Sequence, residues 1–210
     1  LSSINSDFTQ AVFFLALALF VDGVDGTLAR RVDVQNVTPS VDGSVLDNIV
    51  DYFNYVLVPT FMIHWFEFLG DNYSLFLCFL ILSVSSYTFA NKGIKTDDYY
   101  FSGFPALWNL VVLYFYLLDT SELMNIAVVL FLSVFTFIPI KYVHPMRVLS
   151  LKKTTLMMTF LWCLTTVYLL LAVNSVTDIT RTLNMEYVIY CVWILVNLYF
   201  LFITLRRSFQ

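Results

Sequence analysis

Two groups of aspartates lie in otherwise apolar stretches of the sequence. The first lies in FVDGVDGTLARR (residues 20–31), where Asp22 and Asp25 follow the apolar run AVFFLALALF. The second lies in GSVLDNIVDYF, where Asp47 and Asp51 are four positions apart. Carboxylates bind hard divalent cations, which in turn bind phosphates. The pattern therefore predicts that Asp22, Asp25, Asp47 and Asp51 hold two divalent ions, Mg²⁺ or Mn²⁺.

Helical spacing would place these acids on the facing surfaces of two helices. Residues four apart differ by only about 40° in direction around a helix, so the second group shares one face. The first group falls within an arc of about 100° at 3.6 residues per turn. Small residues are interleaved with the acids and leave room for a phosphate-bearing ligand. The predicted faces consist of Asp22, Asp25, Gly26 and Ala29 on one helix, and of Gly43, Asp47 and Asp51 on the other.

The free-energy cost of these acids argues for a function. One aspartate at the centre of a membrane helix costs about 2.5–3.5 kcal/mol on insertion scales. Four isolated ones would cost on the order of 10 kcal/mol, as much as the stability of a whole domain. In the alternative interpretation the acids cap helices or pair with Arg30 and Arg31. Four acids on two facing stripes favour the metal site, because like charges this close need a cation between them.

The composition predicts that helices embedded in a membrane position these acids. The chain has 210 residues, of which 60% are hydrophobic and 12% charged, whereas soluble domains have about 25% charged residues. Apolar runs of about 20 residues, long enough to span a bilayer, recur along the chain. We therefore expect an all-α polytopic membrane protein with a single transmembrane domain, residues 1–210, and no basic face for nucleic acid. The seven expected spans are residues 8–28, 44–69, 72–91, 103–118, 122–142, 154–173 and 185–205.

The distribution of Lys and Arg predicts the orientation. Ten of the 11 basic residues lie in the loops 29–43, 91–102 and 141–153 or at the C-terminus, and only Arg181 lies on the other side. Because positive residues mark the cytoplasmic side, the aspartates are expected to face the cytoplasm. The chain begins at Leu1 without Met and enters an apolar run within a few residues. We expect a further helix upstream.

Eight residues resemble the signature of a known enzyme family. Asp22-xx-Asp25-Gly26-xx-Ala29-Arg30, a spacer, and then Gly43-xxx-Asp47-xxx-Asp51 resemble the motif of the CDP-alcohol phosphotransferases, which covers residues 22–51 here. The spacer, residues 31–42, is longer than is common in the family and resembles that of bacterial phosphatidylcholine synthases. The segments SGFPALWN and IKYVHPMR are also similar to that subfamily. Its members are thought to have eight helices with the signature on the second and third, whereas we expect it here on the first and second.

The resemblance implies a reaction and a role for each signature residue. The family fold and chemistry imply transfer of the phosphatidyl group of CDP-diacylglycerol to choline at a bacterial inner membrane, giving phosphatidylcholine and CMP. The four aspartates would hold the metals, and Asp51 would also act as the general base. Gly26, Ala29 and Gly43 would make room for the CDP moiety, and Arg30 would neutralise a phosphate. Family members are commonly homodimers, so a homodimer is expected.

Other functions stay open from the sequence. The acceptor alcohol within the family could be serine, inositol or glycerol phosphate instead of choline. From a different class, intramembrane carboxylates also occur in metal-coupled or proton-coupled transporters. A transporter places acids near the bilayer midplane between broken helices. Here they cluster towards a predicted cytoplasmic end, which favours the enzyme.

Further candidates for substrate binding lie outside the signature. Choline is a quaternary ammonium, which proteins bind with aromatic faces. Tyr52, Trp108 and Tyr142 are the candidates for this contact, although most aromatic residues in such a chain face lipid or other helices. Lys141 and Arg147 are the candidates for contact with the lipid phosphate of CDP-diacylglycerol. The alternative is that these two belong to an ordinary positive cytoplasmic loop.

Overall fold

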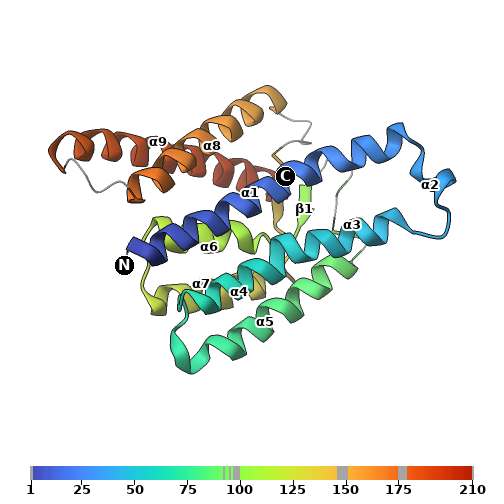
Figure 1. The fold of residues 1–210 in the computed structure, drawn as a ribbon, viewed down its shortest axis with the longest axis horizontal. Coiled ribbons are helices and arrows are strands. Elements are labelled where there is room, and N and C mark those ends of the chain that lie inside the picture. The colour runs from blue at the N-terminus through green and yellow to red at the C-terminus, as the bar shows by residue number, and fades with distance from the viewer. Residues whose placement is uncertain are drawn as a thin grey trace. The chain divides into compact units, whose positions relative to one another are not determined.

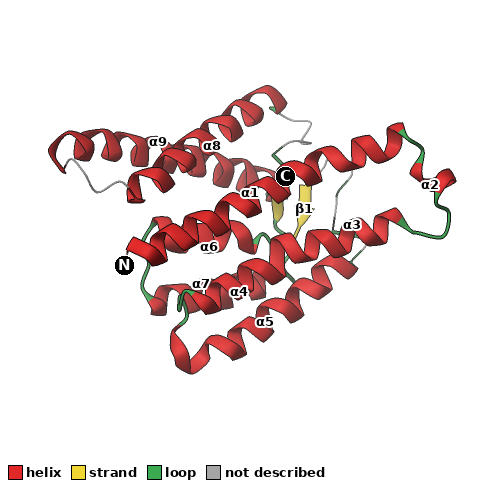
Figure 2. Ribbon diagram, viewed as in Figure 1, coloured by secondary structure: helices red, strands yellow, loops and turns green. Residues whose placement is uncertain are grey.

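The protein consists almost entirely of helices, as the sequence predicts (Figure 2). The computed structural model describes residues 2–91, 93–94, 96, 100–145, 151–174 and 179–209. The helices are α1 (Ser2–Arg31), α2 (Val34–Val37), α3 (Gly43–Tyr52), α4 (Val58–Trp65), α5 (Gly70–Ala90), α6 (Trp108–Leu117), α7 (Glu122–Phe135), α8 (Lys152–Asn174) and α9 (Ile179–Ser208), with a π-helical turn (Phe53–Leu57) between α3 and α4.

Three helices among the described residues are long and apolar enough to cross a membrane. They comprise Gly70–Ala90, Lys152–Ala172 and Glu186–Ser208. Helices α6 and α7 are apolar but have only 10 and 14 residues. At 1.5 Å per residue they are about 15 and 21 Å long, shorter than the roughly 30 Å hydrocarbon core of a bilayer. The protein is therefore a helical membrane protein, and the number of complete spans stays a prediction.

Two of the expected spans contain shorter helices than the hydropathy pattern predicts. Helix α6 begins only at Trp108, after the segment that contains Gly103 and Pro105. Gly103 has φ +88°, and a side chain there would meet the carbonyl oxygen of Thr136. The segment before α6 contains the strand β1 (Tyr100–Ser102), and the segment after α7 contains the strand β2 (Lys141–Val143). The two strands pair as an antiparallel ribbon. The hydropathy pattern predicts neither strand.

The chain divides into two compact units. The first contains residues 7–91 and 106–133, and therefore most of α1, all of α2–α6 and most of α7. The second contains residues 1–6, 92–105 and 134–210, and therefore the ribbon, α8 and α9. Both halves of the aspartate signature, residues 22–30 and 43–51, lie in the first unit.

Within the first unit, α3 and α4 follow one another along one line, with the π-helical turn between them (Figure 1). Away from the aspartates, uncharged side chains join the helices of this unit. Phe8 of α1 is fully buried and stacks on Tyr116 of α6 with 3.9 Å between ring centroids. The Trp108 Nε1–H of α6 donates to Ser85 Oγ of α5 at 2.8 Å. The first contact joins α1, which carries half of the signature, to α6, and the second joins α6 to α5.

In the second unit, α8 and α9 form an antiparallel pair. Trp193 Nε1–H of α9 donates to Thr166 Oγ1 of α8 at 2.9 Å. A second bond joins the hydroxyls of Thr155 and Tyr199 at 3.0 Å. The ribbon joins the end of α9, because the backbone N–H of Lys141 donates to Ser208 Oγ at 2.8 Å.

Candidate functional site

The four signature aspartates come from the last turns of one helix and from a second, short helix. Asp22 and Asp25 lie in the last turns of α1, and Asp47 and Asp51 lie in α3. The chain reverses between them through α2 and a turn (Figure 1). The end of α1 and the start of α3 therefore belong to the same end of the first unit, as the helical spacing predicts.

Helix α3 has a well-defined beginning. The carboxylate of Asp42 accepts hydrogen bonds from the backbone N–H of Ser44 at 2.9 Å and of Val45 at 3.3 Å. The Ser44 hydroxyl donates to the same oxygen at 2.8 Å. These bonds, with the Ser44 hydroxyl contributing most, lower the pKa of Asp42 from its ordinary value. Asp42 is thus the N-cap that fixes where α3 starts. The preference for Asp before an apolar helix could have revealed it from the sequence.

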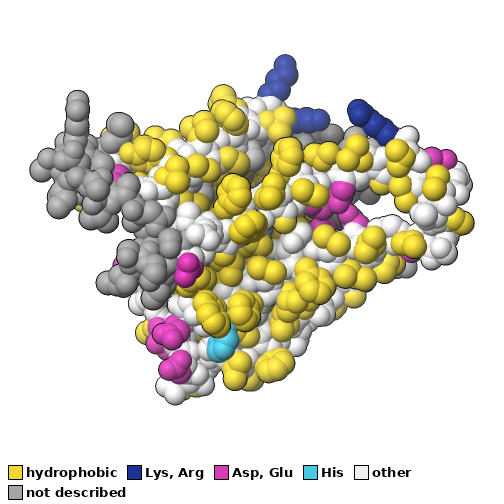
Figure 3. All heavy atoms as spheres, viewed as in Figure 1, with side chains coloured by type: hydrophobic (Ala, Val, Ile, Leu, Met, Phe, Trp, Pro, Cys, Tyr) yellow, Lys and Arg dark blue, Asp and Glu magenta, His cyan; other side chains and the backbone are white. Residues whose placement is uncertain are grey.

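Three of the four signature carboxylates converge. One oxygen from each of Asp22, Asp25 and Asp47 lies within 4.8 Å of the other two. Asp22 and Asp51 are half-buried, whereas Asp47 is exposed. The acidic side chains are visible between α1 and α3 in Figure 3, where hydrophobic side chains cover much of the neighbouring surface. Asp51 lies one helical turn after Asp47 and is not part of this group of three.

This geometry fits a divalent cation. Oxygen ligands lie about 2.0–2.1 Å from Mg²⁺ and about 2.3–2.6 Å from Ca²⁺, so two ligands of one ion are at most about 4 Å apart for Mg²⁺ and about 5 Å apart for Ca²⁺. The three carboxylate oxygens lie within 4.8 Å of one another, inside the larger limit and a small side-chain adjustment from the smaller one. Two unit charges 4 Å apart repel each other by about 1 kcal/mol even in bulk water, and more near a protein surface. A cation between the carboxylates would turn this repulsion into attraction.

A tyrosine joins the two signature helices beside the acids. The Tyr55 hydroxyl donates to Asp22 Oδ2 at 3.2 Å. It also interacts electrostatically with the carboxylates of Asp51 and Asp47. Tyr55 lies in the π-helical turn that follows α3. The sequence places an aromatic residue near Asp51 but gives no sign of this bond, because the partner lies 33 residues earlier in the chain.

The structure describes the surroundings of some of the remaining signature residues but not of others. Gly43 is the first residue of α3, and a methyl group added there would meet no described atom within 4 Å. Ala29 is exposed on α1. The backbone of Gly26 and Arg30 belongs to α1, but their side-chain positions lie outside the described residues. The space beside Gly43 is therefore open towards the surface.

The aromatic candidates for choline binding have partners within the protein. The Tyr52 hydroxyl donates to the carbonyl oxygen of Leu82 at 2.8 Å and so lies against α5. Trp108 is fully buried against Ser85. Tyr142 lies half-buried in β2, where its ring meets Phe104 edge-on. Tyr52 and Trp108 both bond to α5 within the first unit, whereas Tyr142 belongs to the second unit. The contact of these residues with choline stays a prediction.

One of the two basic candidates lies in the ribbon. Lys141 is in β2, and its ammonium donates to Ser102 Oγ of β1 at 3.0 Å. Arg147 lies outside the described residues. Lys141 belongs to the second unit and the aspartates to the first, so its role in phosphate binding stays a prediction.

Comparison with known proteins identifies the family. The sequence model of the CDP-alcohol phosphatidyltransferase family matches residues 1–139, which include the whole signature. A phosphatidylcholine synthase of Pseudomonas aeruginosa is 39% identical over 197 residues, which is 94% of this chain and 79% of that protein. A phosphatidylcholine synthase of Borreliella burgdorferi is 31% identical over 99% of this chain and 88% of that protein.

Other relatives are longer than the present chain. A phosphatidylcholine synthase of Mesorhizobium japonicum is 40% identical over 155 residues, which is 74% of this chain but 58% of that protein. The chain thus spans little more than half the length of this relative.

Proposed function

The chain belongs to the CDP-alcohol phosphatidyltransferase family, and we propose that it is a phosphatidylcholine synthase. It would transfer the phosphatidyl group of CDP-diacylglycerol to choline, giving phosphatidylcholine and CMP. The observation that carries the proposal is the convergence of the Asp22, Asp25 and Asp47 carboxylates within 4.8 Å on the two signature helices. The names of two relatives, whose alignments cover 94% and 99% of this chain, support choline as the acceptor.

Asp51 is proposed as the general base. The choline hydroxyl is a poor nucleophile until its proton is removed, and a carboxylate within hydrogen-bond reach can accept that proton. The choline oxygen then forms a bond to the phosphorus that carries diacylglycerol. The bond between this phosphorus and the bridging oxygen of the pyrophosphate breaks, and CMP leaves with the electron pair. Asp51 is half-buried on the same helix as Asp47, one turn further along, which suits this role.

Asp22, Asp25 and Asp47, together with Asp51, are the residues that would hold two divalent ions, Mg²⁺ or Mn²⁺. When bound, such ions supply positive charge that orients a pyrophosphate and stabilises charge on the attacking and leaving oxygens. The role of the four carboxylates would be to hold this positive charge between the last turns of α1 and helix α3.

The small residues would shape the nucleotide site. Gly26, Ala29 and Gly43 would leave space for the CDP moiety, and the open surface beside Gly43 supports this. Arg30 would neutralise one phosphate with its planar guanidinium. Lys141 and Arg147 are proposed to contact the lipid phosphate of the same substrate. Choline would be read by aromatic faces, with Tyr52, Trp108 and Tyr142 as the candidates.

The proposal includes an arrangement in the membrane. The seven apolar segments would lie in a bacterial inner membrane as one catalytic domain, residues 1–210, with the aspartates facing the cytoplasm. The asymmetry of Lys and Arg between the loops supports this orientation. A homodimer is expected for the family. A cysteine in place of Ser40, in the turn between the signature helices, should react with an impermeant maleimide in inverted vesicles and not in intact spheroplasts.

An assay of acceptor specificity tests the reaction. The full-length protein in membranes would receive CDP-diacylglycerol, Mn²⁺ and one labelled alcohol at a time, with an Asp51→Asn variant alongside. We expect choline incorporation with equimolar CMP release, and neither in the variant or after chelation. Incorporation of serine, inositol or glycerol phosphate instead would contradict the choline proposal and keep the carboxylate mechanism. No incorporation of any alcohol by the folded protein would contradict both.

A further inference from the structure

We propose that Tyr55 is a positioning residue that holds the Asp22 carboxylate in place for metal binding. Its hydroxyl donates to Asp22 Oδ2 at 3.2 Å and thereby joins the second signature helix to the first. Tyr55 is not one of the eight signature residues. The inference rests on the proposed metal-dependent function and assigns a further residue to the same site.

The backbone explains why Tyr55 reaches the acids. Tyr55 continues the spacing of four that runs from Gly43 through Asp47 and Asp51. In an α-helix each such step drifts by about 40°, so a third step would carry the side chain away from the first face. The π-helical turn Phe53–Leu57 is wider than an α-helical turn, so each of its residues turns through a smaller angle. The wider turn offsets the drift and keeps Tyr55 on the side of α1.

A neighbouring tyrosine shows that this placement is selective. Tyr52 lies three residues earlier, yet its hydroxyl donates to the Leu82 carbonyl oxygen of α5. Of these two tyrosines, Tyr55 bonds to α1 and Tyr52 bonds to α5. Both side chains are half-buried, so each hydroxyl has a defined partner rather than bulk water.

The bond would act by fixing one oxygen of the carboxylate. A carboxylate has two oxygens with about four acceptor positions, so the bond to Tyr55 leaves Oδ1 available to a cation. Carboxylates that bind metals are commonly held by such outer partners, whose removal weakens metal affinity. The tyrosine hydroxyl is uncharged, so it orients Asp22 without competing with the cation as a lysine or arginine would.

The test measures metal binding directly. Purified full-length protein would be titrated with Mn²⁺, and the free ion would be followed by electron paramagnetic resonance. We expect Tyr55→Phe to raise the Kd for Mn²⁺ by about tenfold, the lower end of the range for outer partners. Asp22→Asn should raise it further. In activity assays Tyr55→Phe should raise the Mn²⁺ concentration needed for half-maximal rate and leave the KM for choline at saturating Mn²⁺ unchanged.

Tyr199→Phe is the matched control. Tyr199 also joins two helices through its hydroxyl, which bonds to Thr155 at 3.0 Å, but it lies in the other unit. Both variants lose one hydroxyl from one interhelical bond, so a general loss of stability would affect them alike. The Kd of Tyr199→Phe should equal that of the wild type. A Tyr55→Phe Kd within twofold of the wild type, or an equal rise in both variants, would overturn the inference.

Two further results separate this inference from the function it rests on. If wild-type protein bound no Mn²⁺, the metal-dependent function would fail and the inference with it. If Tyr55→Phe did not fold, 3-fluorotyrosine in place of Tyr55 would keep the hydroxyl and give a fluorine resonance. Its shift should follow added Mg²⁺ at the Kd of the site, and a resonance that Mg²⁺ leaves unmoved would overturn the inference.

Discussion

Helices α3 and α4 follow one another in the chain but have very different surroundings. None of the ten residues of α3, all of which the structure describes, is buried. In α4, half of the eight residues are buried, namely Pro59, Thr60, Met62 and Ile63. Asp47 and Asp51 lie in the exposed helix, and α4 continues the chain into the packed part of the same unit. We infer that the proposed reaction constrains the residue types in α3, whereas packing against other helices constrains those in α4.

Two glycines show the same difference. A methyl group at Gly43 would meet no described atom within 4 Å. At Gly70 it would overlap the Glu122 carboxylate, and the backbone has φ +62°. The left-handed backbone therefore favours glycine at position 70, whereas no contact among the described residues requires glycine at position 43. The open space beside Gly43 supports its proposed place in the nucleotide site, which stays a prediction.

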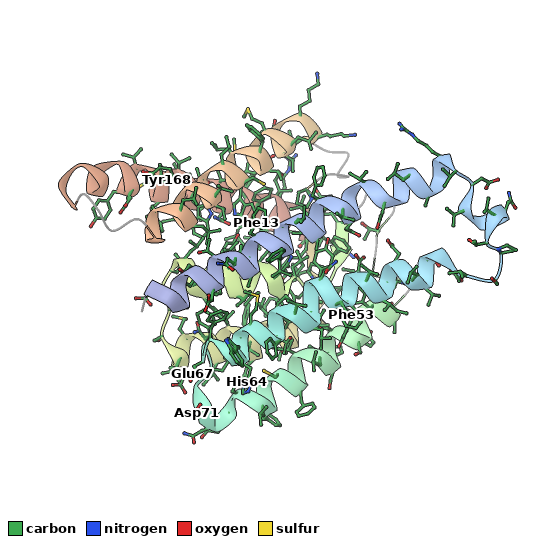
Figure 4. All side chains as sticks on the ribbon, in the orientation of Figure 1. Phe13, Phe53, His64, Glu67, Asp71 and Tyr168 are labelled. Carbon is green, nitrogen blue, oxygen red and sulfur yellow. The ribbon has the colours of Figure 1, made fainter. Side chains whose placement is uncertain are left out.

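Polar groups differ between the regions as well. His64, Glu67 and Asp71 lie around the turn between α4 and α5, at the end of α4 away from α3 (Figure 4). His64 Nδ1 bonds to Ser74 Oγ at 2.8 Å within that packed region. Between α1 and α3, three carboxylates lie within 4.8 Å of one another, an arrangement that favours a cation. Substitutions should therefore affect activity at the open end and stability at the packed end.

The largest effect is expected at Asp51. Asp51→Asn removes the proposed base and one metal ligand without changing the size of the side chain. We expect CMP release to fall by about 10²–10⁴-fold, the contribution typical of general acid–base groups. Thermal unfolding should change little. Asp33→Asn is the control, because Asp33 lies in the turn before α2 and has φ 52°, which asparagine tolerates. Equal rates in the two variants would contradict the role of Asp51.

Gly70→Ala should produce the opposite result at the packed end. The left-handed backbone and the overlap with Glu122 should lower the free energy of unfolding by about 1–3 kcal/mol. The rate per folded molecule should stay that of the wild type. Adding Glu122→Ala should recover the part of the loss that comes from overlap, leaving the backbone part. A stable Gly70→Ala protein with a low rate would contradict the division between the two regions.

The helices that carry the aspartates could be predicted from the sequence. Apolar runs and spacing by four predict that the aspartates lie on two successive helices, and α1 and α3 contain them as expected. Periodicity works here because each signature helix is regular over the residues concerned. The same spacing reaches Tyr55, but the residue pattern does not show the π-helical turn that keeps it on the same side.

Contacts between distant segments could not be predicted. Hydropathy predicts an uninterrupted span over residues 122–142, whereas α7 ends at Phe135 and residues 141–143 pair with β1. That pairing joins strands about 40 residues apart, and hydropathy does not report it. For the same reason the sequence shows Trp108 only as an aromatic residue, because its partner Ser85 lies on another helix.

Gly43→Ala sharpens the comparison with a smaller effect. Alanine favours a helix over glycine by about 0.5–1 kcal/mol, and the open surface gives its methyl group room. Stability should therefore stay the same or rise. The methyl group should occupy space that we assign to the CDP moiety and raise the KM for CDP-diacylglycerol about tenfold, as one misplaced methylene can. The KM for choline is the internal control. An unchanged KM for CDP-diacylglycerol would remove Gly43 from the nucleotide site.

The smallest effect is expected at Asp42, which caps α3 from a fully exposed position. Its pKa in the folded protein is lowered, chiefly by the Ser44 hydroxyl, from an ordinary value of 3.8. The stabilisation is therefore fully present above the unfolded-state pKa and is lost as the pH falls below it, through the lowered folded-state pKa. Hydrogen exchange of the Ser44 and Val45 amides, which donate to Asp42, measures the cap locally.

Two substitutions separate the charge of Asp42 from its role as a cap. The pH-corrected protection of the two amides should fall in the wild type as the medium becomes more acidic than pH 4. Asp42→Asn keeps an acceptor that does not titrate, so its protection should not depend on pH in this range. Asp42→Ala should lose protection at every pH. A pH-dependent loss of equal size in Asp42→Asn would show that another group, and not this carboxylate, controls the beginning of the helix that carries Asp47 and Asp51.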